Sequence, residues 1–263
     1  EAAKAVRDIM ERKAFGEAGS RVVIEEFLEG PEVSVLAFTD GKTIVPMVSS
    51  MDHKRALDGD KGLNTGGMGV VAPNPYYTDE TAKLCMEKIF LPTVRAMNAM
   101  GAPFKGCLYF GLMLTQDGPK VIEYNCRFGD PEAQAVLPLL QSDLFSIMRH
   151  VTDGTLDQAD VRFSNGASCC VVLASGGYPL AYEKGKPVRG LAEAAKLPAT
   201  YVFHAGTKKE GRQIVTSGGR VLGVTAVADT LPEAIGRAYA AAKLITFEGA
   251  HMRTDIGQKA LEA

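Results

Sequence analysis

The sequence has little net charge and no long hydrophobic run, and both absences exclude classes of partner. Its 29 Lys and Arg side chains nearly balance 31 Asp and Glu side chains, so the formal net charge of the 263 residues is -2. Binding to nucleic acid or to a membrane surface needs a concentrated basic field, which this composition does not supply. No apolar stretch approaches the length of a membrane helix, and the amino end has no signal-peptide pattern. We therefore expect a cytoplasmic protein without a nucleic-acid or membrane partner.

Cysteine and histidine also lack the spacings that mark common sites. The 5 cysteines are odd in number, and none forms a CxxC or CxxH pattern. They indicate reduced thiols in a cytosolic protein, and neither a disulfide framework nor a zinc site. The histidines show no metal-ligand spacing, and the sequence has no Ser-His-Asp or nucleophile-elbow pattern.

The patterns that are present predict a mixed α+β fold. Hydrophobic periodicity predicts helices over residues 1–13 and 78–100, and strands over residues 21–27, 33–39, 43–48, 106–115 and 120–124. Asp40-Gly41 predicts a type I′ hairpin turn, whereas residues 51–73 are glycine-rich with little periodicity and predict a long loop. Thr78 and Ser142 are expected N-caps, and Thr230 with Glu233 has capping-box spacing.

The chain changes character in its last third. Residues 155–166 have low periodicity and form the predicted domain boundary. Beyond them, short strands separated by glycine turns and followed by one helix predict a small α+β unit. We therefore predict one domain over residues 1–158 and a second over residues 166–263.

The sequence is chemically richest in KVIEYNCRFGDPEAQ, residues 120–134. Alternate residues of a strand share a face, so Glu123 and Asn125, with Arg127 if the strand extends that far, would project together. Two oxygen ligands beside a fixed cation suit a magnesium-bound phosphate, because Mg²⁺ takes one or two protein oxygens and completes its shell with phosphate and water. Arg127 would then bind the anion directly. A solvated strand end with a surface salt bridge is the alternative.

Two further stretches carry weaker signals. EEFLEGPEVS, residues 25–34, could offer backbone groups to a purine edge and Glu32 to ribose hydroxyls, or could be an ordinary acidic turn. NTGGMG, residues 64–69, leaves backbone N–H groups uncovered for an anion, with Lys54 and Arg55 as countercharge. A flexible surface loop is the alternative, and the lack of a following Gly-Lys-Ser/Thr excludes a Walker loop.

These stretches occur in an order that resembles one enzyme family. The residues that carry the resemblance are IEEFLEGPEVS (24–34), DHKR (52–55), NTGGMG (64–69), EYNCRFGDPE (123–132), HAGT (204–207) and SGGRVL (217–222). Together they resemble phosphoribosylamine-glycine ligase, an ATP-grasp enzyme of purine biosynthesis, over essentially the whole chain. The resemblance implies an ATP-grasp catalytic portion, with an antiparallel sheet and helices, followed by a small α+β C-terminal domain.

The resemblance also implies an activity. Such a ligase phosphorylates the carboxylate of glycine with ATP, and the amine of 5-phosphoribosylamine then attacks the glycyl phosphate to give glycinamide ribonucleotide, ADP and phosphate. Phosphoryl transfer mainly needs metal, cations and alignment. The alternatives are another ATP-grasp carboxylate-amine ligase of nucleotide metabolism and a non-catalytic nucleotide-binding module.

Roles for individual residues follow from the resemblance. It implies that Glu123 and Asn125 bind Mg²⁺ or Mn²⁺, and that Arg127 and Asn125 act in catalysis. The implied ATP-binding residues are Glu25, Glu26, Phe27, Leu28 and Glu32, and the implied substrate-binding residues are Asp52, Lys54, Asn64, Thr65, Gly66 and Gly67. Many ATP-grasp enzymes carry another acid on the strand before the metal pair, but residues 106–115 hold none, so a second metal lacks an expected ligand.

The resemblance further implies that part of the family's architecture lies outside this sequence. Family members carry an amino-terminal domain and, ahead of the position of Glu1, a first part of the ATP-grasp unit with lysines and a mobile glycine loop. We therefore expect this chain alone to bind ATP weakly and to turn over poorly. The expected whole enzyme is a monomer, with ATP, glycine and 5-phosphoribosylamine as its small-molecule partners.

Overall fold

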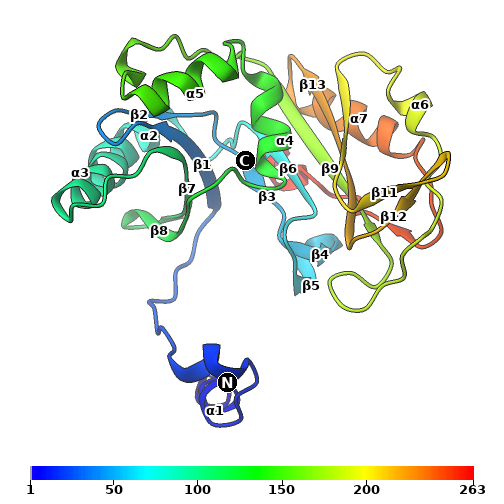
Figure 1. The fold of residues 1–263 in the computed structure, drawn as a ribbon, viewed down its shortest axis with the longest axis horizontal. Helices are drawn as coiled ribbons and strands as arrows, with labels where there is room; N and C mark the ends of the chain where they lie inside the picture. Colours follow the sequence, from blue (N-terminus) through cyan, green and yellow to red (C-terminus); the bar gives the residue numbers. More distant parts are fainter. Residues whose placement is uncertain (1) are drawn as a thin grey trace.

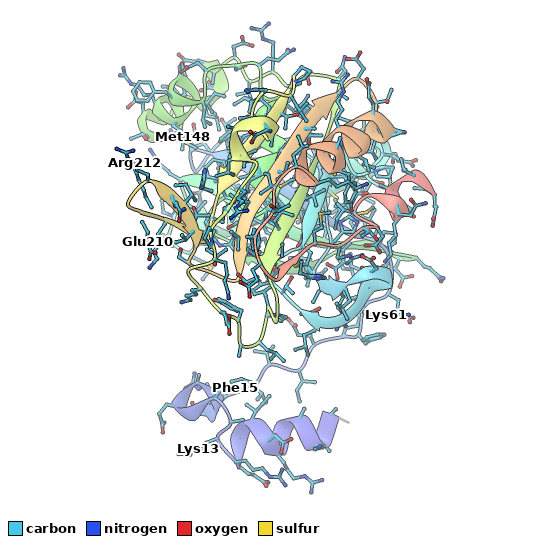
Figure 2. The ribbon with its side chains drawn as sticks, turned by 90° about the vertical axis from the view of Figure 1, so that its right-hand side faces the viewer. Lys13, Phe15, Lys61, Met148, Glu210 and Arg212 are labelled. Atoms are coloured by element: carbon cyan, nitrogen blue, oxygen red, sulfur yellow. The ribbon has the colours of Figure 1, made fainter. Side chains whose placement is uncertain are left out.

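The computed structural model describes residues 2–263, so Glu1, with which the first predicted helix begins, lies outside the described residues. The helix is confirmed as α1 (Ala2–Met10), and a short 3-10 turn, η1 (Gly16–Ser20), follows it. Both stand apart from the rest of the molecule and are joined to it by an extended stretch of chain (Figure 1). Figure 2 shows Lys13 and Phe15 on this separate part and Lys61 on the main body.

The predicted strand over residues 21–27 is wrong. This stretch is extended, but it pairs with no other part of residues 2–263. A strand needs a neighbour for its backbone N–H and C=O groups, and a β-type sequence cannot supply one by itself. Val23, Ile24 and Phe27 are 84%, 84% and 86% exposed.

The first sheet has four antiparallel strands in the order β2-β1-β7-β8. Its strands are β1 (Glu32–Thr39), β2 (Ile44–Pro46), β7 (Gly106–Thr115) and β8 (Gly118–Asn125). Alternate side chains of its central strands enter different cores, because successive residues of a strand point to opposite faces. Val35 and Phe110 enter one core, and Leu36 and Tyr109 enter the other.

The β1–β2 hairpin is confirmed, but its turn differs from the predicted type I′. Thr39 pairs with Ile44, so residues 40–43 form the loop. A type I′ turn requires positive φ at both central residues, and within this loop only Gly41 has it, at 90°. The Asp40 carboxylate holds the loop by accepting hydrogen bonds from the backbone N–H groups of Lys42 (2.9 Å) and Thr43 (2.7 Å).

A nearly continuous helical run covers one face of this sheet. It consists of α2 (Asp79–Cys85), the π turn η3 (Met86–Phe90) and α3 (Leu91–Ala99). The hydroxyl of Thr78 accepts a hydrogen bond from the backbone N–H of Thr81 (3.2 Å), which confirms Thr78 as the N-cap. The π turn ends just before Pro92, whose missing N–H interrupts the helical hydrogen-bond pattern.

The other face is covered by α4 (Glu132–Val136), η4 (Leu137–Leu139) and α5 (Leu144–Asp153). The predicted Ser142 cap of α5 is wrong. Asp143 is the N-cap, and its carboxylate accepts a hydrogen bond from the Ser146 N–H (2.6 Å). The Ser142 hydroxyl accepts a hydrogen bond from the Arg162 N–H (2.8 Å) and is therefore used to fix the following loop.

The second sheet joins residues from both sides of the predicted domain boundary. Its strands follow the order β10-β13-β9-β6-β3, and β14 also pairs with β9. They are β3 (Met51–Asp52), β6 (Gly69–Ala72), β9 (Ala167–Ser175), β10 (Thr200–His204), β13 (Arg220–Ala228) and β14 (Ala250–His251). Helix α7 (Leu231–Ala242) packs on one face and α4 on the other. The division into residues 1–158 and 166–263 stays a prediction.

The glycine-rich stretch over residues 51–73 is not the predicted long loop. It forms β3, a hairpin of β4 (Arg55–Leu57) and β5 (Lys61–Asn64) around the turn η2 (Asp58–Asp60), and then β6. These strands are too short to produce a periodic pattern in the sequence. Moreover, β6 finds its partner in β9, far along the chain.

The remaining elements are η5 (Leu156–Gln158), α6 (Leu191–Ala194), β11 (Thr207–Glu210), β12 (Gln213–Thr216) and α8 (Gln258–Leu261). β11 and β12 form a hairpin that carries Glu210 and Arg212 (Figure 2). The predicted capping box is wrong, because the Thr230 side chain makes no cap hydrogen bond and Glu233 pairs with Arg237 (2.6 Å). None of the helices within residues 2–263 combines the length and apolarity needed to cross a bilayer.

Candidate functional site

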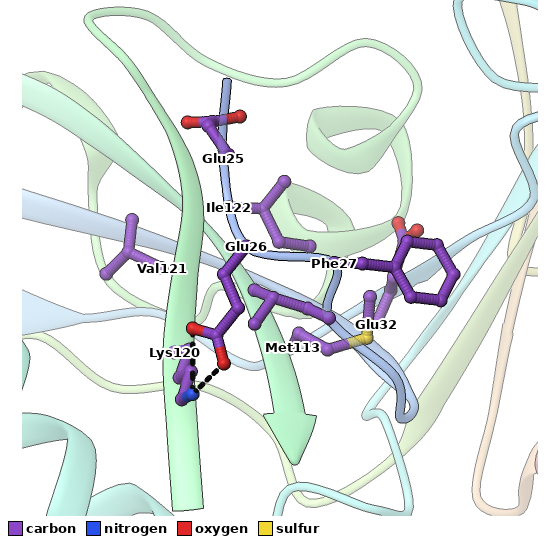
Figure 3. A pocket seen from close by; sticks show the side chains of 9 residues that line it. Glu25, Glu26, Phe27, Glu32, Met113, Lys120, Val121 and Ile122 are labelled. Carbon is purple, nitrogen blue, oxygen red and sulfur yellow. Dashed lines mark hydrogen bonds and ion pairs between the residues drawn. The ribbon is translucent and has the colours of Figure 1, made fainter. Parts of the chain in front are cut away.

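The first cavity lies where the extended segment before β1 passes over β8. It has a volume of about 290 Å³ and is lined by Glu25, Glu26, Phe27, Leu28, Glu32, Met113, Lys120, Val121 and Ile122. All five residues predicted to bind ATP are in this lining. The two carboxylate oxygens of Glu26 accept hydrogen bonds from Lys120 Nζ at 2.7 and 2.9 Å, which fastens the segment to β8 (Figure 3).

The floor of the first cavity is apolar. Met113 of β7 and Ile122 of β8 project beneath the segment that carries Phe27 (Figure 3). Gly111 pairs with Glu123 and Leu112 with Val121, so Ile122 is the extra residue of a β-bulge. A flat apolar floor beneath an exposed backbone segment fits a planar aromatic ring with polar edges.

The second cavity adjoins the first and is more polar. It has a volume of about 620 Å³ and is lined by Gly30, Pro31, Glu32, Met51, Asp52, Lys54, Arg55, Asp60, Asn64, Tyr76, Ile122 and Lys259. Glu32 and Ile122 line both cavities. Three of the six predicted substrate-binding residues, Asp52, Lys54 and Asn64, are therefore together in one cavity.

The other three predicted substrate-binding residues do not line either cavity. The Thr65 hydroxyl donates a hydrogen bond to the Lys54 carbonyl (2.8 Å) and accepts one from the Gly67 N–H (3.0 Å). The Gly66 N–H donates to the hydroxyl of Tyr178 (3.0 Å). These contacts fix the shape of the loop, so Thr65, Gly66 and Gly67 stay only predicted as substrate contacts.

Lys54 connects the second cavity to the predicted metal residues. Its ammonium lies 2.8 Å from Glu32 Oε2. Burial opposes the charge on this lysine, but the hydrogen bond to Glu32 and the charges of Glu32, Asp52 and Glu123 outweigh burial and raise its pKa. Lys54 is therefore a fixed cation with acidic groups of both cavities around it.

Glu123 and Asn125 lie two residues apart on β8, opposite Gly111 and Tyr109 of β7. A Cβ atom on Gly111 would lie 3.0 Å from Glu123 Cγ, so the glycine leaves room for this carboxylate to lie across the sheet. A carboxylate and an amide oxygen on one strand face fit a divalent ion whose other ligands are phosphate and water. No group of three or more His, Cys, Asp or Glu side chains in residues 2–263 has the arrangement of a metal site.

Arg127 does not extend the strand face as the sequence allowed. β8 ends at Asn125, and Arg127 follows in a bend. Its guanidinium is exposed and donates a hydrogen bond to the carbonyl of Phe128 (2.9 Å). The residue is close in sequence to the Glu123–Asn125 pair, but the bend and not the strand sets its position.

Asp52, which lines the second cavity, lies close enough to the buried Glu132 for the two carboxyl groups to interact. Burial and then the charge of Glu132 raise the pKa of Asp52 well above its ordinary range. Among the described residues, Asp52 Oδ1 is a buried oxygen without a hydrogen-bond partner. Glu132, 4% exposed, accepts a long hydrogen bond from the Ser34 hydroxyl (3.4 Å), and that hydroxyl also bonds Tyr109 Oη (2.7 Å). Neither Glu132 nor Tyr109 was a predicted site residue, although Glu132 lies in the EYNCRFGDPE motif.

Arg220, on β13, was also missed as a functional candidate. Its Nη1 donates hydrogen bonds to the carbonyls of Gly66 (2.6 Å) and Asp130 (2.7 Å), and its Nη2 lies 3.2 Å from Asp130 Oδ2. This arginine therefore joins the NTGGMG loop to the Gly-Asp-Pro turn after Arg127. Its presence in the SGGRVL motif was the available signal, but only the fold brings β13 to these two loops.

Comparison with known proteins places both halves of the chain in one enzyme family. Residues 1–133 match the ATP-grasp (A) domain of phosphoribosylglycinamide synthetase, and residues 168–259 match its C domain. The phosphoribosylamine–glycine ligase of Vibrio vulnificus (strain YJ016) is 49% identical over 262 residues, which cover 99% of this chain and 61% of that protein. The trifunctional purine biosynthetic protein adenosine-3 of Bos taurus is 50% identical over 262 residues, which cover 99% of this chain and 26% of that protein.

Solved structures agree with this placement. The phosphoribosylamine–glycine ligase of Thermotoga maritima superposes with a TM-score of 0.79 at 35% sequence identity, over 88% of this chain and 57% of that chain. The biotin carboxylase domain of Hydrogenobacter thermophilus 2-oxoglutarate carboxylase, solved with MgADP, superposes with a TM-score of 0.68 at 14% identity, over 95% of this chain and 53% of that chain, which shows a shared fold alone. The predicted α+β fold, an ATP-grasp portion followed by a small C-terminal domain, is confirmed. The chain belongs to the phosphoribosylglycinamide synthetase family.

Proposed function

We propose that this chain forms the metal-binding and acceptor-binding side of the active site of a phosphoribosylamine–glycine ligase. The enzyme joins glycine to 5-phosphoribosylamine through glycyl phosphate and releases glycinamide ribonucleotide, ADP and phosphate. The observation that carries the proposal is the meeting of two cavities at Glu32 and Ile122, one with an apolar floor and one polar. The relatives that bear this enzyme's name align with 99% of this chain. The aligned region is 61% of the length of those relatives.

The first cavity binds ATP in this proposal. The backbone of residues 25–28 contacts the adenine edge, Met113 and Ile122 support the ring, and Glu32 contacts the ribose. Glu123 and Asn125 then hold Mg²⁺ or Mn²⁺, which supplies charge neutralisation at the phosphates when bound. Arg127 binds the transferred phosphoryl group, because a guanidinium matches phosphate with two parallel hydrogen bonds.

The second cavity binds the two substrates that are joined. A carboxylate is a poor acyl donor until one of its oxygens becomes part of a phosphate leaving group. Because that phosphoryl group comes from ATP in the first cavity, the carboxylate of glycine must lie at the border between the two cavities. Lys54 lies at that border, since it contacts Glu32 and interacts electrostatically with Asp52 and Glu123. Asp52 and Asn64 contact the amine acceptor. Both residues line the second cavity, so together they can align the acceptor with the acyl group, and alignment supplies much of the rate in such transfers.

Replacement of Glu123 tests the proposal. Loss of a metal-bound carboxylate removes stabilisation of the phosphoryl-transfer transition state, so Glu123→Ala should cost on the order of 3 kcal/mol in kcat/KM, or about a hundredfold. The measurement is ADP release by the intact enzyme with glycine and 5-phosphoribosylamine. Glu210→Ala is the matched control, because Glu210 pairs with Lys208 (2.5 Å) on the distant β11–β12 hairpin.

Two outcomes would contradict the proposal. If the unaltered enzyme releases no ADP with this substrate pair, the chain belongs to a ligase with another acid or amine, or binds a nucleotide without catalysis. If Glu123→Ala turns over at the normal rate, the metal assignment on β8 is wrong.

We also propose that the enzyme works in the cytoplasm as a monomer. The five cysteines are free in the structure, which suits a reducing compartment. Light scattering of the purified enzyme would give the mass of one chain. A dimer mass at micromolar concentration would overturn the oligomeric assignment.

A further inference from the structure

The C-terminal segment, residues 251–259, lies against the β4–β5 hairpin that forms one wall of the second cavity. His251 Nε2 and the Ala56 carbonyl are 2.8 Å apart, and the Thr254 N–H donates to Asp58 Oδ1 (2.8 Å). The Gly59 N–H donates to Asp255 Oδ2 (2.8 Å). The wall is therefore shaped by residues almost two hundred positions further along the chain.

Arg253 is at the centre of these contacts. Its side chain is 1% exposed, and its Nε and Nη2 donate to the two oxygens of Asp255 at 2.7 and 2.8 Å. Its Nη1 donates to Asp60 Oδ1 (2.9 Å) and to the Arg55 carbonyl (3.2 Å). A buried guanidinium is costly unless its hydrogen bonds are satisfied, and here every nitrogen has a partner. Such a group holds its partners in one geometry.

Two of these partners belong to residues that line the second cavity. Arg55 and Asp60 line the second cavity, and so does Lys259, which forms an ion pair with Asp60. In the turn η2, Gly59 and Asp60 have positive φ values of 66° and 52°, and this conformation costs free energy at Asp60, which is not a glycine, so contacts from outside the turn help to hold it. Arg253 supplies such a contact through its hydrogen bond to Asp60, and Arg253 itself lines neither cavity.

We infer that Arg253 is a positioning residue for the acceptor substrate, acting through Asp60 and the Arg55 backbone to hold the β4–β5 wall, which carries Asn64. The inference rests on the proposed function, in which the second cavity takes the amine acceptor. Apart from Glu32 and Ile122, which line both cavities, the ATP cavity is lined by residues 25–28 and by other residues of β7 and β8, so the effect is largest for the acceptor.

The test compares Michaelis constants in the intact enzyme. Arg253→Lys keeps the charge but loses the planar fork, so it cannot satisfy Asp255, Asp60 and the Arg55 carbonyl together. We expect the KM for 5-phosphoribosylamine to rise about tenfold or more, because a small displacement of a binding wall is enough to produce such a loss. The KM for ATP should change less than about twofold. Arg237→Lys is the matched control, since Arg237 also bonds a carboxylate and a backbone carbonyl but lies on α7.

A second variant separates positioning from general stability. Asp60→Asn removes the carboxylate charge that pairs with Arg253, so it should also raise the KM for 5-phosphoribosylamine. The KM of the double variant should not exceed that of the more severe single variant. Equal increases in the KM for ATP and for 5-phosphoribosylamine, or additive effects in the double variant, would overturn the inference. Absence of ligase activity in the unaltered enzyme would instead refute the proposed function.

Discussion

His53 is a buried histidine held between two backbone groups, and its protonation should control stability in mild acid. It is 3% exposed, its Nε2 accepts a hydrogen bond from the Gly257 N–H (3.1 Å), and its Nδ1 lies 3.1 Å from the Gly69 carbonyl. Burial, and then the charge of Arg253, lower its pKa to about 4, although Asp60 and Asp255 oppose the shift. The ring is therefore neutral in the folded enzyme at neutral pH.

The sign of the resulting pH dependence follows from this lowered pKa. The unfolded chain takes up a proton near pH 6.5, before the folded chain does, so the stability from His53 is complete above pH 6.5 and is lost as pH falls toward 4. The loss amounts to about 3 kcal/mol. Urea unfolding of the wild type between pH 7 and pH 4 should show it, whereas His53→Gln should have a flatter profile. Parallel profiles would contradict the assignment.

Gly67 illustrates a close approach that only glycine allows. Its φ is +108°, and a Cβ atom there would overlap Pro131 Cδ and lie 2.6 Å from Asp52 Oδ1. Gly101 also has positive φ, +71°, but no atom lies within 4 Å of its Cβ position. Gly101→Ala should therefore cost about 1 kcal/mol of unfolding free energy from backbone strain alone.

Gly67→Ala carries the same strain and a steric overlap with the Gly-Asp-Pro turn. We expect it to lower the free energy of unfolding by about 2 kcal/mol more than Gly101→Ala does, as overpacked sites do. It should also reduce kcat/KM, because Asp52 lies in the second cavity. Denaturant unfolding of both variants, with steady-state kinetics, gives the comparison. Equal losses of stability would show that the loop moves aside freely.

At the residue scale, the sequence was most informative where one motif held several polar groups. Glu123 and Asn125 could be assigned to one strand face because alternate strand residues share a side. Met113 and Ile122 could not be found, since β7 is apolar throughout and a bulge leaves no mark in the pattern. The buried contacts of Glu132 depend on Ser34 and Tyr109, which are distant in sequence.

Among the elements, β13 has a role beyond its own sheet because it delivers Arg220 to two loops of the candidate site. The guanidinium donates to the Gly66 and Asp130 carbonyls and pairs with the Asp130 carboxylate. Arg220→Lys should free the NTGGMG loop, because an ammonium cannot span three acceptors that a planar fork reaches. We expect kcat/KM to fall about tenfold.

Hydrogen exchange provides a direct measure of that loop. Amide protons of residues 64–69 should exchange faster in Arg220→Lys, while those of β1 and β7 keep their protection. Unchanged exchange across residues 64–69 would mean that Thr65 and Tyr178 hold the loop without Arg220. Arg162→Lys, which alters an exposed pair with Asp160, is a suitable comparison.

Elements with long, regular patterns could be predicted, and short or unpaired ones could not. Strands β1 and β7 and the helical run after Thr78 follow from their own sequences, because each holds enough residues to show a period. The stretch over residues 21–27 has β-type residues but no partner among residues 2–263. Strands β3 to β6 were missed because each has only two to four residues, and because β6 pairs with β9, which is distant in the sequence.

The two halves of the molecule share one sheet, so we expect them to unfold together. Strand β9 is buried along its whole length and pairs with β13 on one side and β6 on the other. Removing the first half would expose the β6 edge of β9 and its apolar face. Residues 166–263 expressed alone should therefore aggregate or bind hydrophobic dyes.

Buried thiols can report this cooperativity. Cys85 packs in the core between the first sheet and its helical run, and Cys169 lies in the core of the second sheet, and both are buried. In increasing urea, alkylation of the two thiols should begin at the same concentration. Separate urea midpoints for the two thiols would indicate two independently stable domains, in agreement with the predicted division into residues 1–158 and 166–263.

The position of the C-terminal segment beneath the β4–β5 hairpin has a consequence for synthesis on the ribosome. Asp58 emerges 196 residues before Thr254, its hydrogen-bond partner. At a synthesis rate of roughly 5–20 residues per second, the groups that support the hairpin are made about 10–40 seconds after the hairpin itself. The first cavity uses only residues up to Ile122 and is completed early. A nascent chain thus completes its second cavity last, and any chain released before residue 251 would hold the first cavity without the support of the second.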